Sequence, residues 1–135
     1  MRSSQIDDET IRRVLSYETW AVVGWSPSSW RDSHRIAALL ESRGKRVLHV
    51  NPRAEGALPD LAAAGPVDVV DVFRRADQAG AHVDEAIEAG ARAVWMQLGV
   101  IDHDAAERAR AAGLDVVMDR CPAIEWPRLE MGASL

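Results

Sequence analysis

The stretch Trp20-Ala21-Val22-Val23-Gly24-Trp25-Ser26-Pro27 decides the fold of this chain. Its β-forming residues end in a glycine turn, and a helical pattern begins a few residues later. This order is typical of an α/β domain in which a first strand, buried on both faces, runs into a helix. The glycine lets an anion such as phosphate approach the backbone, and the helix N-terminus offers it unpaired N–H groups. The stretch therefore predicts an anion site at the end of the first strand.

A helix, a glycine just past its end and an apolar strand recur three times further along the chain. The glycines are Gly44, Gly90 and Gly113, and glycine commonly follows a helix end. With the opening stretch, the pattern predicts strands at 20–24, 46–50, 67–72, 93–97 and 114–118. Their alternation with helices predicts an α/β, Rossmann-like three-layer fold, in which helices cover both faces of a five-stranded parallel sheet. We expect the strand order 3-2-1-4-5, with the winding reversed beside strand one.

Apolar periodicity predicts the helices that connect these strands. A short amphipathic helix over 8–15 is expected to pack against the sheet edge. Asp32 or Ser33 is expected to cap the next helix, and its buried stripe is formed by Ile36, Leu39 and Leu40.

The second half of the chain is less uniform. A helix is expected over 78–89, and another begins after the N-cap Asp102. The segment 52–66 mixes Ala, Gly and Pro, so we expect a loop with at most one short helix, anchored by Leu58 and Leu61. After Pro122 the periodicity is lost, and a short irregular tail is expected.

Composition sets the broad class of protein. A chain of 135 residues fits one domain over 1–135, with a folded core at about 18–125 and a short C-terminal tail. The net charge is −5 and no basic run is present, which argues against nucleic acid and anionic membranes as partners. No apolar stretch approaches the roughly 20 residues of a membrane span, and the first residues lack a signal-peptide pattern. We therefore expect a cytoplasmic protein.

Cysteine and histidine usage argues against metal and catalytic sites. Cys121 is the single cysteine, so no internal disulfide is expected, and no Cys/His cluster has metal-ligand spacing. The four histidines share no spacing, and none is paired with a nucleophile by the sequence. We therefore expect neither a metal site nor enzyme activity.

Ligands of open parallel sheets bind beyond the carboxyl ends of the strands, near the point where the winding reverses. The chemically distinctive residues of this chain fall at those ends. Glycines, amide side chains and arginines together suit a phosphorylated ligand. The expected binding residues are Gly24, Trp25, Ser26, Pro27 and Arg31 after strand one, Asn51, Pro52 and Arg53 after strand two, Phe73 and Arg74 after strand three, Gln97, Leu98 and Gly99 after strand four, and Arg120 and Cys121 after strand five.

Five runs of sequence, taken in order, resemble a known family. They are Val22-Val23-Gly24-Trp25-Ser26, Val50-Asn51-Pro52, Asp68-Val69-Val70-Asp71-Val72-Phe73-Arg74-Arg75, Ala93-Val94-Trp95-Met96-Gln97-Leu98-Gly99-Val100 and Val116-Val117-Met118-Asp119-Arg120-Cys121. The ordered set resembles the small bacterial CoA-binding proteins, stand-alone domains similar to the N-terminal domain of the succinyl-CoA synthetase alpha subunit. The resemblance covers nearly all of the expected core.

The resemblance implies coenzyme A or an acyl-CoA as the ligand. It implies binding without catalysis, by a carrier, a sensor or an accessory module of an acyl-transferring enzyme. The turns after strands one and two would hold the pyrophosphate and 3′-phosphate region, and the turns after strands three and four would line the adenine and pantetheine path. The segment from Arg53 to Gly65 is shorter than its counterpart in the family. Cys121, near the ligand mouth, would permit a mixed disulfide with the CoA thiol.

Two other function classes stay open. The first is an NAD(P)-binding Rossmann domain of a redox regulator or an oxidoreductase partner. NAD domains usually carry Asp or Glu at the end of strand two, whereas this chain has Asn51-Pro52-Arg53, which suits phosphate and leaves NADP open. The second is an enzyme acting on a CoA ester, which would need a paired base and nucleophile or a metal site, and no such pattern is found. No oligomeric state follows from the sequence.

Overall fold

A computed structural model describes residues 8–131 and contains the expected five-stranded parallel sheet. The strands are β1 (Thr19–Val23), β2 (Arg46–Val50), β3 (Val69–Val72), β4 (Ala93–Met96) and β5 (Asp115–Met118). Each strand begins and ends within two residues of its predicted bounds. The helices are α1 (Asp8–Ser16), α2 (Asp32–Ser42), α3 (Leu61–Ala64), α4 (Ala76–Glu88), α5 (His103–Ala111) and α6 (Pro122–Arg128).

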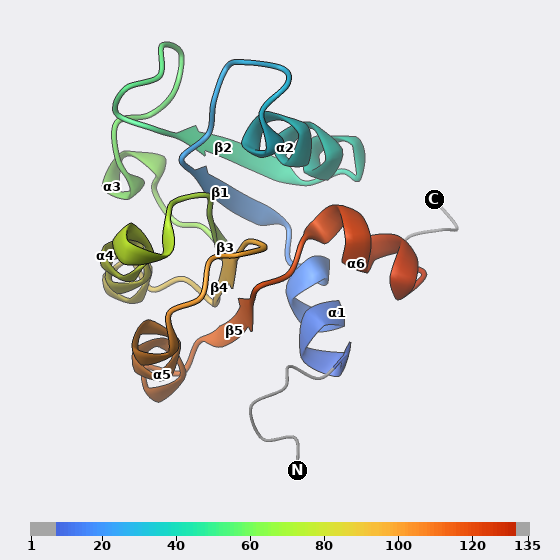
Figure 1. Cartoon of the computed structure of the whole chain (residues 1–135), viewed down its shortest axis with the longest axis vertical. Helices are drawn as coiled ribbons and strands as arrows, with labels where there is room; N and C mark the ends of the chain where they lie inside the picture. The colour runs from blue at the N-terminus through green and yellow to red at the C-terminus, as the bar shows by residue number, and fades with distance from the viewer. Residues whose placement is uncertain (1–7, 132–135) are drawn as a thin grey trace.

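Helices cover both faces of the sheet, as Figure 1 shows: α1, α2 and α6 lie on one side, and α3, α4 and α5 on the other. The sheet separates two apolar cores because alternate strand residues point to opposite faces. Trp20 and Val22 belong to the core under α1, α2 and α6, whereas Ala21 and Val23 belong to the opposite core. The three-layer Rossmann-like architecture is confirmed.

The strand order is β2-β1-β3-β4-β5, so the predicted order 3-2-1-4-5 is wrong in the position of strand three. That strand pairs with β1 instead of lying outside β2. The residues explain why: β2 carries Arg46 and His49 and is only partly buried, as suits an edge strand, while every residue of β3 is buried. The connection through α3 packs on β2 and β1 and returns the chain to the middle of the sheet. The winding still reverses beside β1.

Helix α1 packs at the β5 edge of the sheet, as predicted. Arg13 holds Asp115, the first residue of β5, through two hydrogen bonds of 3.0 and 2.9 Å. Tyr17 also donates to this carboxylate, at 3.2 Å. The bond from Arg13 is the main reason why the pKa of Asp115 is lowered.

Two local predictions need correction. The N-cap of α2 is Arg31, not Asp32 or Ser33, and it makes no side-chain capping bond. The hydroxyl of Ser33 instead accepts a bond from the Ser26 amide, which draws this side chain into the first loop. The tail after Cys121 is not irregular: it forms α6, with Pro122 in the first turn, where its missing N–H costs nothing. Asp102 caps α5 as predicted, accepting from the Ala105 amide at 3.0 Å.

Gly24 brings the loops after β1 and β3 together. Its φ is +90°, and a Cβ atom at this position would collide with the carbonyl oxygen of Phe73. The amide of Phe73 donates to the carbonyl of Val23 at 2.8 Å, which fixes the approach. A side chain is therefore excluded both by the backbone conformation and by the neighbouring loop.

Asp71, in the middle of the sheet, is completely buried between its register partners Val22 and Trp95. Neither carboxylate oxygen has a hydrogen-bond partner. Burial raises the pKa of Asp71 well above its ordinary value, which favours the neutral acid. Protonation avoids the larger cost of a buried, unpaired charge.

We expect Gly24→Ala to destabilise the fold more than Gly113→Ala does. Gly113 has a similar φ of +94° but open space around it, so its substitution isolates the cost of the backbone conformation, about 1–2 kcal/mol. The Gly24 variant adds the collision with Phe73. Urea denaturation of both variants measures the difference, and equal losses would contradict the close approach.

The stability of an Asp71→Asn variant, relative to wild type, is expected to rise with pH. Because the folded pKa of Asp71 is raised, the folded protein keeps a proton that the unfolded chain releases above about pH 3.9. The stability that this group contributes is fully present below that pH and is lost as the pH rises towards the folded pKa. Denaturation between pH 4 and 8 should show a difference that grows by at most about 1.4 kcal/mol per pH unit. A pH-independent difference would mean that Asp71 is ionised in the fold.

Candidate functional site

Three adjoining hollows open at the carboxyl ends of the strands, where the winding reverses between β1 and β3. Arg74, just after β3, lines all three. Gly24 and Phe73, whose backbones meet at the reversal, each line two. These shared residues join the hollows into one site.

The first, which we call the polar hollow, has a volume of about 520 Å³. It is lined by Gly24, Ser26, Trp30, Arg31, Asp32, Ser33, Asn51, Phe73 and Arg74. Its two arginines face a single carboxylate, Asp32, which is already paired with Arg35. The excess of positive charge suits an anion.

The loop that borders the polar hollow is held in place from two sides. The side chain of Asn51 donates through Nδ2 to the Trp25 carbonyl at 2.8 Å and accepts at Oδ1 from the Arg53 amide at 2.9 Å. On the other side, Ser33 Oγ accepts from the Ser26 amide at 3.0 Å. A loop fixed in this way loses little further entropy when it binds a ligand.

Arg74 is half-buried, and its Nη2 donates to Gln78 Oε1 at 2.9 Å. Its buried Nε has no hydrogen-bond partner. The neighbouring Arg75 pairs with Asp77. Within residues 8–131, the only side-chain partner of Arg74 is the neutral amide of Gln78. A guanidinium with an unused N–H group and no acid beside it suits a phosphate oxygen.

The second hollow, which we call the apolar groove, has a volume of about 720 Å³ and runs between α2 and the start of α6. It is lined by Asp32, Arg35, Ile36, Leu39, Phe73, Arg74, Arg75, Gln97, Leu98, Gly99, Val100, Cys121 and Ala123. Gln97 is only 6% exposed, and its Oε1 has no partner. The groove therefore combines apolar walls with an unsatisfied hydrogen-bond acceptor.

The third hollow, which we call the β2 hollow, has a volume of about 330 Å³ and lies beside the end of β2. It is lined by Val23, Gly24, Val50, Pro52, Arg53, Pro59, Asp60, Leu61, Arg74, His82 and Glu85. Its acids are engaged: Asp60 accepts from the Ala63 amide at the start of α3, and Glu85 lies 2.9 Å from His82 Nδ1. Arg53 and Arg74 are its cations.

Most of the predicted binding residues therefore come together. The exceptions are Trp25, Pro27 and Arg120, which line none of the three hollows. Trp25 is buried and stacks on His49, with ring centroids 4.1 Å apart. Burial is the main cause that lowers the pKa of this histidine. Arg120 turns back, and its Nη1 donates to the Asp119 carbonyl at 3.0 Å. Binding by these three residues stays a prediction.

Sequence reasoning missed several lining residues for identifiable reasons. Ile36 and Leu39 were assigned to the core stripe of α2, yet Leu39 is only half-buried and both line the apolar groove. Ala123 was missed because α6 was not expected. Trp30 was not missed: the sequence offers it, in the first loop, as a candidate to cover a ligand, and it is 67% exposed and lines the polar hollow.

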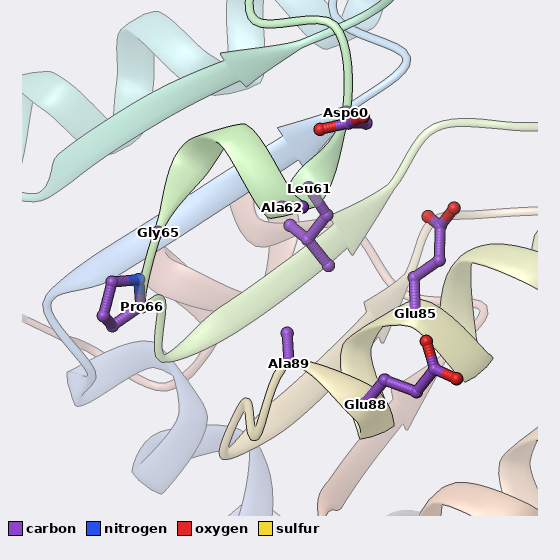
Figure 2. A pocket seen from close by; sticks show the side chains of 8 residues that line it. All are labelled: Asp60, Leu61, Ala62, Gly65, Pro66, Glu85, Glu88 and Ala89. Carbon is purple, nitrogen blue, oxygen red and sulfur yellow. The ribbon is translucent and has the colours of Figure 1, made fainter.

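A fourth hollow, of about 550 Å³, lies between α3 and α4 (Figure 2); it shares Asp60, Leu61 and Glu85 with the β2 hollow, but none of the predicted binding residues lines it. Asp60, Glu85 and Glu88 make its lining acidic. Figure 2 shows both glutamates on α4 beside the apolar Leu61 of α3. This acidic hollow contains no basic side chain among its lining residues, so it does not suit a phosphorylated ligand.

Within residues 8–131, no group of three His, Cys, Asp or Glu side chains is arranged to hold a metal ion. In the same part of the chain, no helix has the length and apolar character to span a membrane.

Comparison with known proteins identifies relatives of the whole fold. YneT of Bacillus subtilis (strain 168), an uncharacterized protein, is 34% identical over 107 residues, which are 75% of this chain and 79% of YneT. The crystal structure of Prb, a protein redesigned for binding, is 34% identical, has a TM-score of 0.88, and the match covers 95% of each chain. The cell-free ID.343 protein from Thermus thermophilus is 34% identical, with a TM-score of 0.84, over 92% of this chain and 99% of that one.

The family model of the CoA binding domain matches residues 18–127. This range begins just before β1 and ends in α6, so it includes every strand and all three hollows at the carboxyl ends. It also agrees closely with the range over which the sequence resembles the small CoA-binding proteins. This chain belongs to the CoA-binding domain family.

Proposed function

We propose that this protein binds coenzyme A or an acyl-CoA, without catalysis, in the hollows at the carboxyl ends of its strands. Arg74 carries the proposal, because it lines all three hollows and its buried Nε lacks a partner. A phosphate oxygen of the ligand would accept from this group. In this role the protein would act as a carrier, a sensor or an accessory module of an acyl-transferring enzyme.

The chemistry of the hollows matches the chemistry of the ligand class. Arginines line all three hollows, and phosphates would be held in the polar hollow and the β2 hollow, whereas most of the remaining wall of the apolar groove is aliphatic or aromatic. CoA has the same polarity: its phosphates lie at the nucleotide end, and a long, weakly polar arm extends from them. The two kinds of surface meet at Phe73 and Arg74.

The residues around the site support binding more than catalysis. Of the residues that line the three hollows, one is a histidine. This residue, His82, is paired with Glu85. Cys121 lines the apolar groove, while His82 lines the β2 hollow. A base and a nucleophile would need to lie within hydrogen-bond reach of one another, and these two line different hollows.

Calorimetric titration with CoA, acetyl-CoA, NAD and NADP tests the ligand class. We expect the two CoA compounds to bind more tightly than either dinucleotide, because Arg53 follows Asn51 and Pro52 at the end of β2, where an acid would hold the ribose of NAD. Selective binding of NAD or NADP would overturn the assignment and support a dinucleotide-binding domain.

Substitution of Arg74 by Ala is expected to weaken CoA binding by about 10- to 150-fold, because a hydrogen bond to a charged group contributes about 1.5–3 kcal/mol. Arg92→Ala is the matched control: this arginine is exposed, pairs with Asp68 and lines none of the hollows. Calorimetry gives both affinities, and a thermal melt checks that both variants fold. Equal affinity of the folded Arg74 variant and wild type would remove Arg74 from the site.

A further inference from the structure

The lining of the apolar groove includes a buried polar group whose role the fold does not explain. Gln97, just after β4, is 94% buried, since its exposed fraction is 6%. It lines the groove, and its Oε1 makes no hydrogen bond. A buried acceptor without a donor destabilises the fold, so an apolar side chain here would make the unliganded protein more stable. Such a cost is typical of a residue retained for a ligand.

The walls around Gln97 indicate the kind of ligand segment that would reach it. Ile36 and Leu39 come from α2, Phe73 and Val100 from the loops after β3 and β4, and Ala123 from α6. These side chains offer contact to hydrocarbon, and the charged residues of the same lining are Asp32, Arg35, Arg74 and Arg75. The groove joins the polar hollow at Phe73 and Arg74, so a ligand anchored by its phosphates could extend into it.

We propose that the apolar groove is an acyl site: it receives an aliphatic acyl chain, and Gln97 Oε1 accepts a hydrogen bond from an amide N–H of the arm that carries this chain. The inference rests on the proposed function and deepens it, because it makes a short-chain acyl-CoA, and not free CoA, the preferred ligand. Phosphates held at Arg74 fix one end of the ligand. The groove then binds the acyl chain at the other end of the ligand.

Cys121 allows the position of the acyl chain to be measured in the native protein. It is the single cysteine of the chain, it is partly exposed, and it lines the apolar groove. Butyryl-CoA has no free thiol, so alkylation of Cys121 by a maleimide can be followed in its presence. We expect saturating butyryl-CoA to slow alkylation in proportion to the fraction of protein bound. Adenosine 3′,5′-bisphosphate, which lacks the arm, should bind and leave the rate unchanged.

The alkylation experiment separates this inference from the proposed function. If calorimetry shows that butyryl-CoA binds while Cys121 reacts at its full rate, the acyl site is overturned and CoA binding stands. If CoA binds and butyryl-CoA does not, the acyl site is again overturned and CoA binding stands. If neither compound binds, both are overturned.

Affinity across acetyl-, propionyl- and butyryl-CoA gives a second test. Burial of each added methylene in the groove should strengthen binding by up to about fourfold. Constant or falling affinity along the series would place the acyl chain outside the groove.

Gln97→Leu tests the hydrogen bond, because it should raise the stability of the unliganded protein and lower its affinity for butyryl-CoA. Removing the unsatisfied acceptor should raise the melting temperature of the unliganded protein, while butyryl-CoA should bind about tenfold more weakly. Binding of adenosine 3′,5′-bisphosphate should not change. Met96→Leu is the matched control, because Met96 precedes Gln97 but belongs to the core on the opposite face of the sheet. A Gln97 variant that melts lower and binds butyryl-CoA as wild type does would assign Gln97 a structural role instead.

Discussion

The structure depends on the close approach of two backbones where the winding of the sheet reverses. The loops after β1 and β3 meet at Gly24 and Phe73, and no side chain fits between them. Because the strands are parallel and adjacent, their carboxyl ends open into the same crevice. Arg74, the next residue after Phe73, is thereby placed at the centre of three hollows. The same contact that closes the fold thus positions its main cation.

The site is polar on one side of this contact and apolar on the other. Neighbouring chain segments hold the first loop through Asn51 and Ser33, so the polar side is formed before a ligand arrives. On the apolar side, Gln97 is buried and its Oε1 has no hydrogen-bond donor. This unpaired acceptor lowers the stability of the unliganded protein. The two halves together suit a long ligand with charge at one end and hydrocarbon at the other.

Much of this could be predicted from the sequence, because the signals are local. Glycines at helix ends and runs of apolar residues located all five strands, and most of the residues that follow those runs line the three hollows of the candidate site. The strand order could not be read in the same way, since it depends on which strand is the edge. Arg46 and His49 in β2, against the nearly continuous apolar run of β3, carried that information. Helix α6 and the groove residue Ala123 were missed because the short segment after Pro122 shows no clear apolar periodicity, whereas this proline begins a helix.

A crystal structure of the protein with bound CoA tests the central claim most directly. The account predicts that the phosphates lie in the polar hollow or the β2 hollow, with a phosphate oxygen within hydrogen-bond distance of Arg74 Nε. CoA bound elsewhere, for example against the acidic hollow between α3 and α4, would contradict it. So would CoA at the strand ends with Arg74 Nε still unpaired.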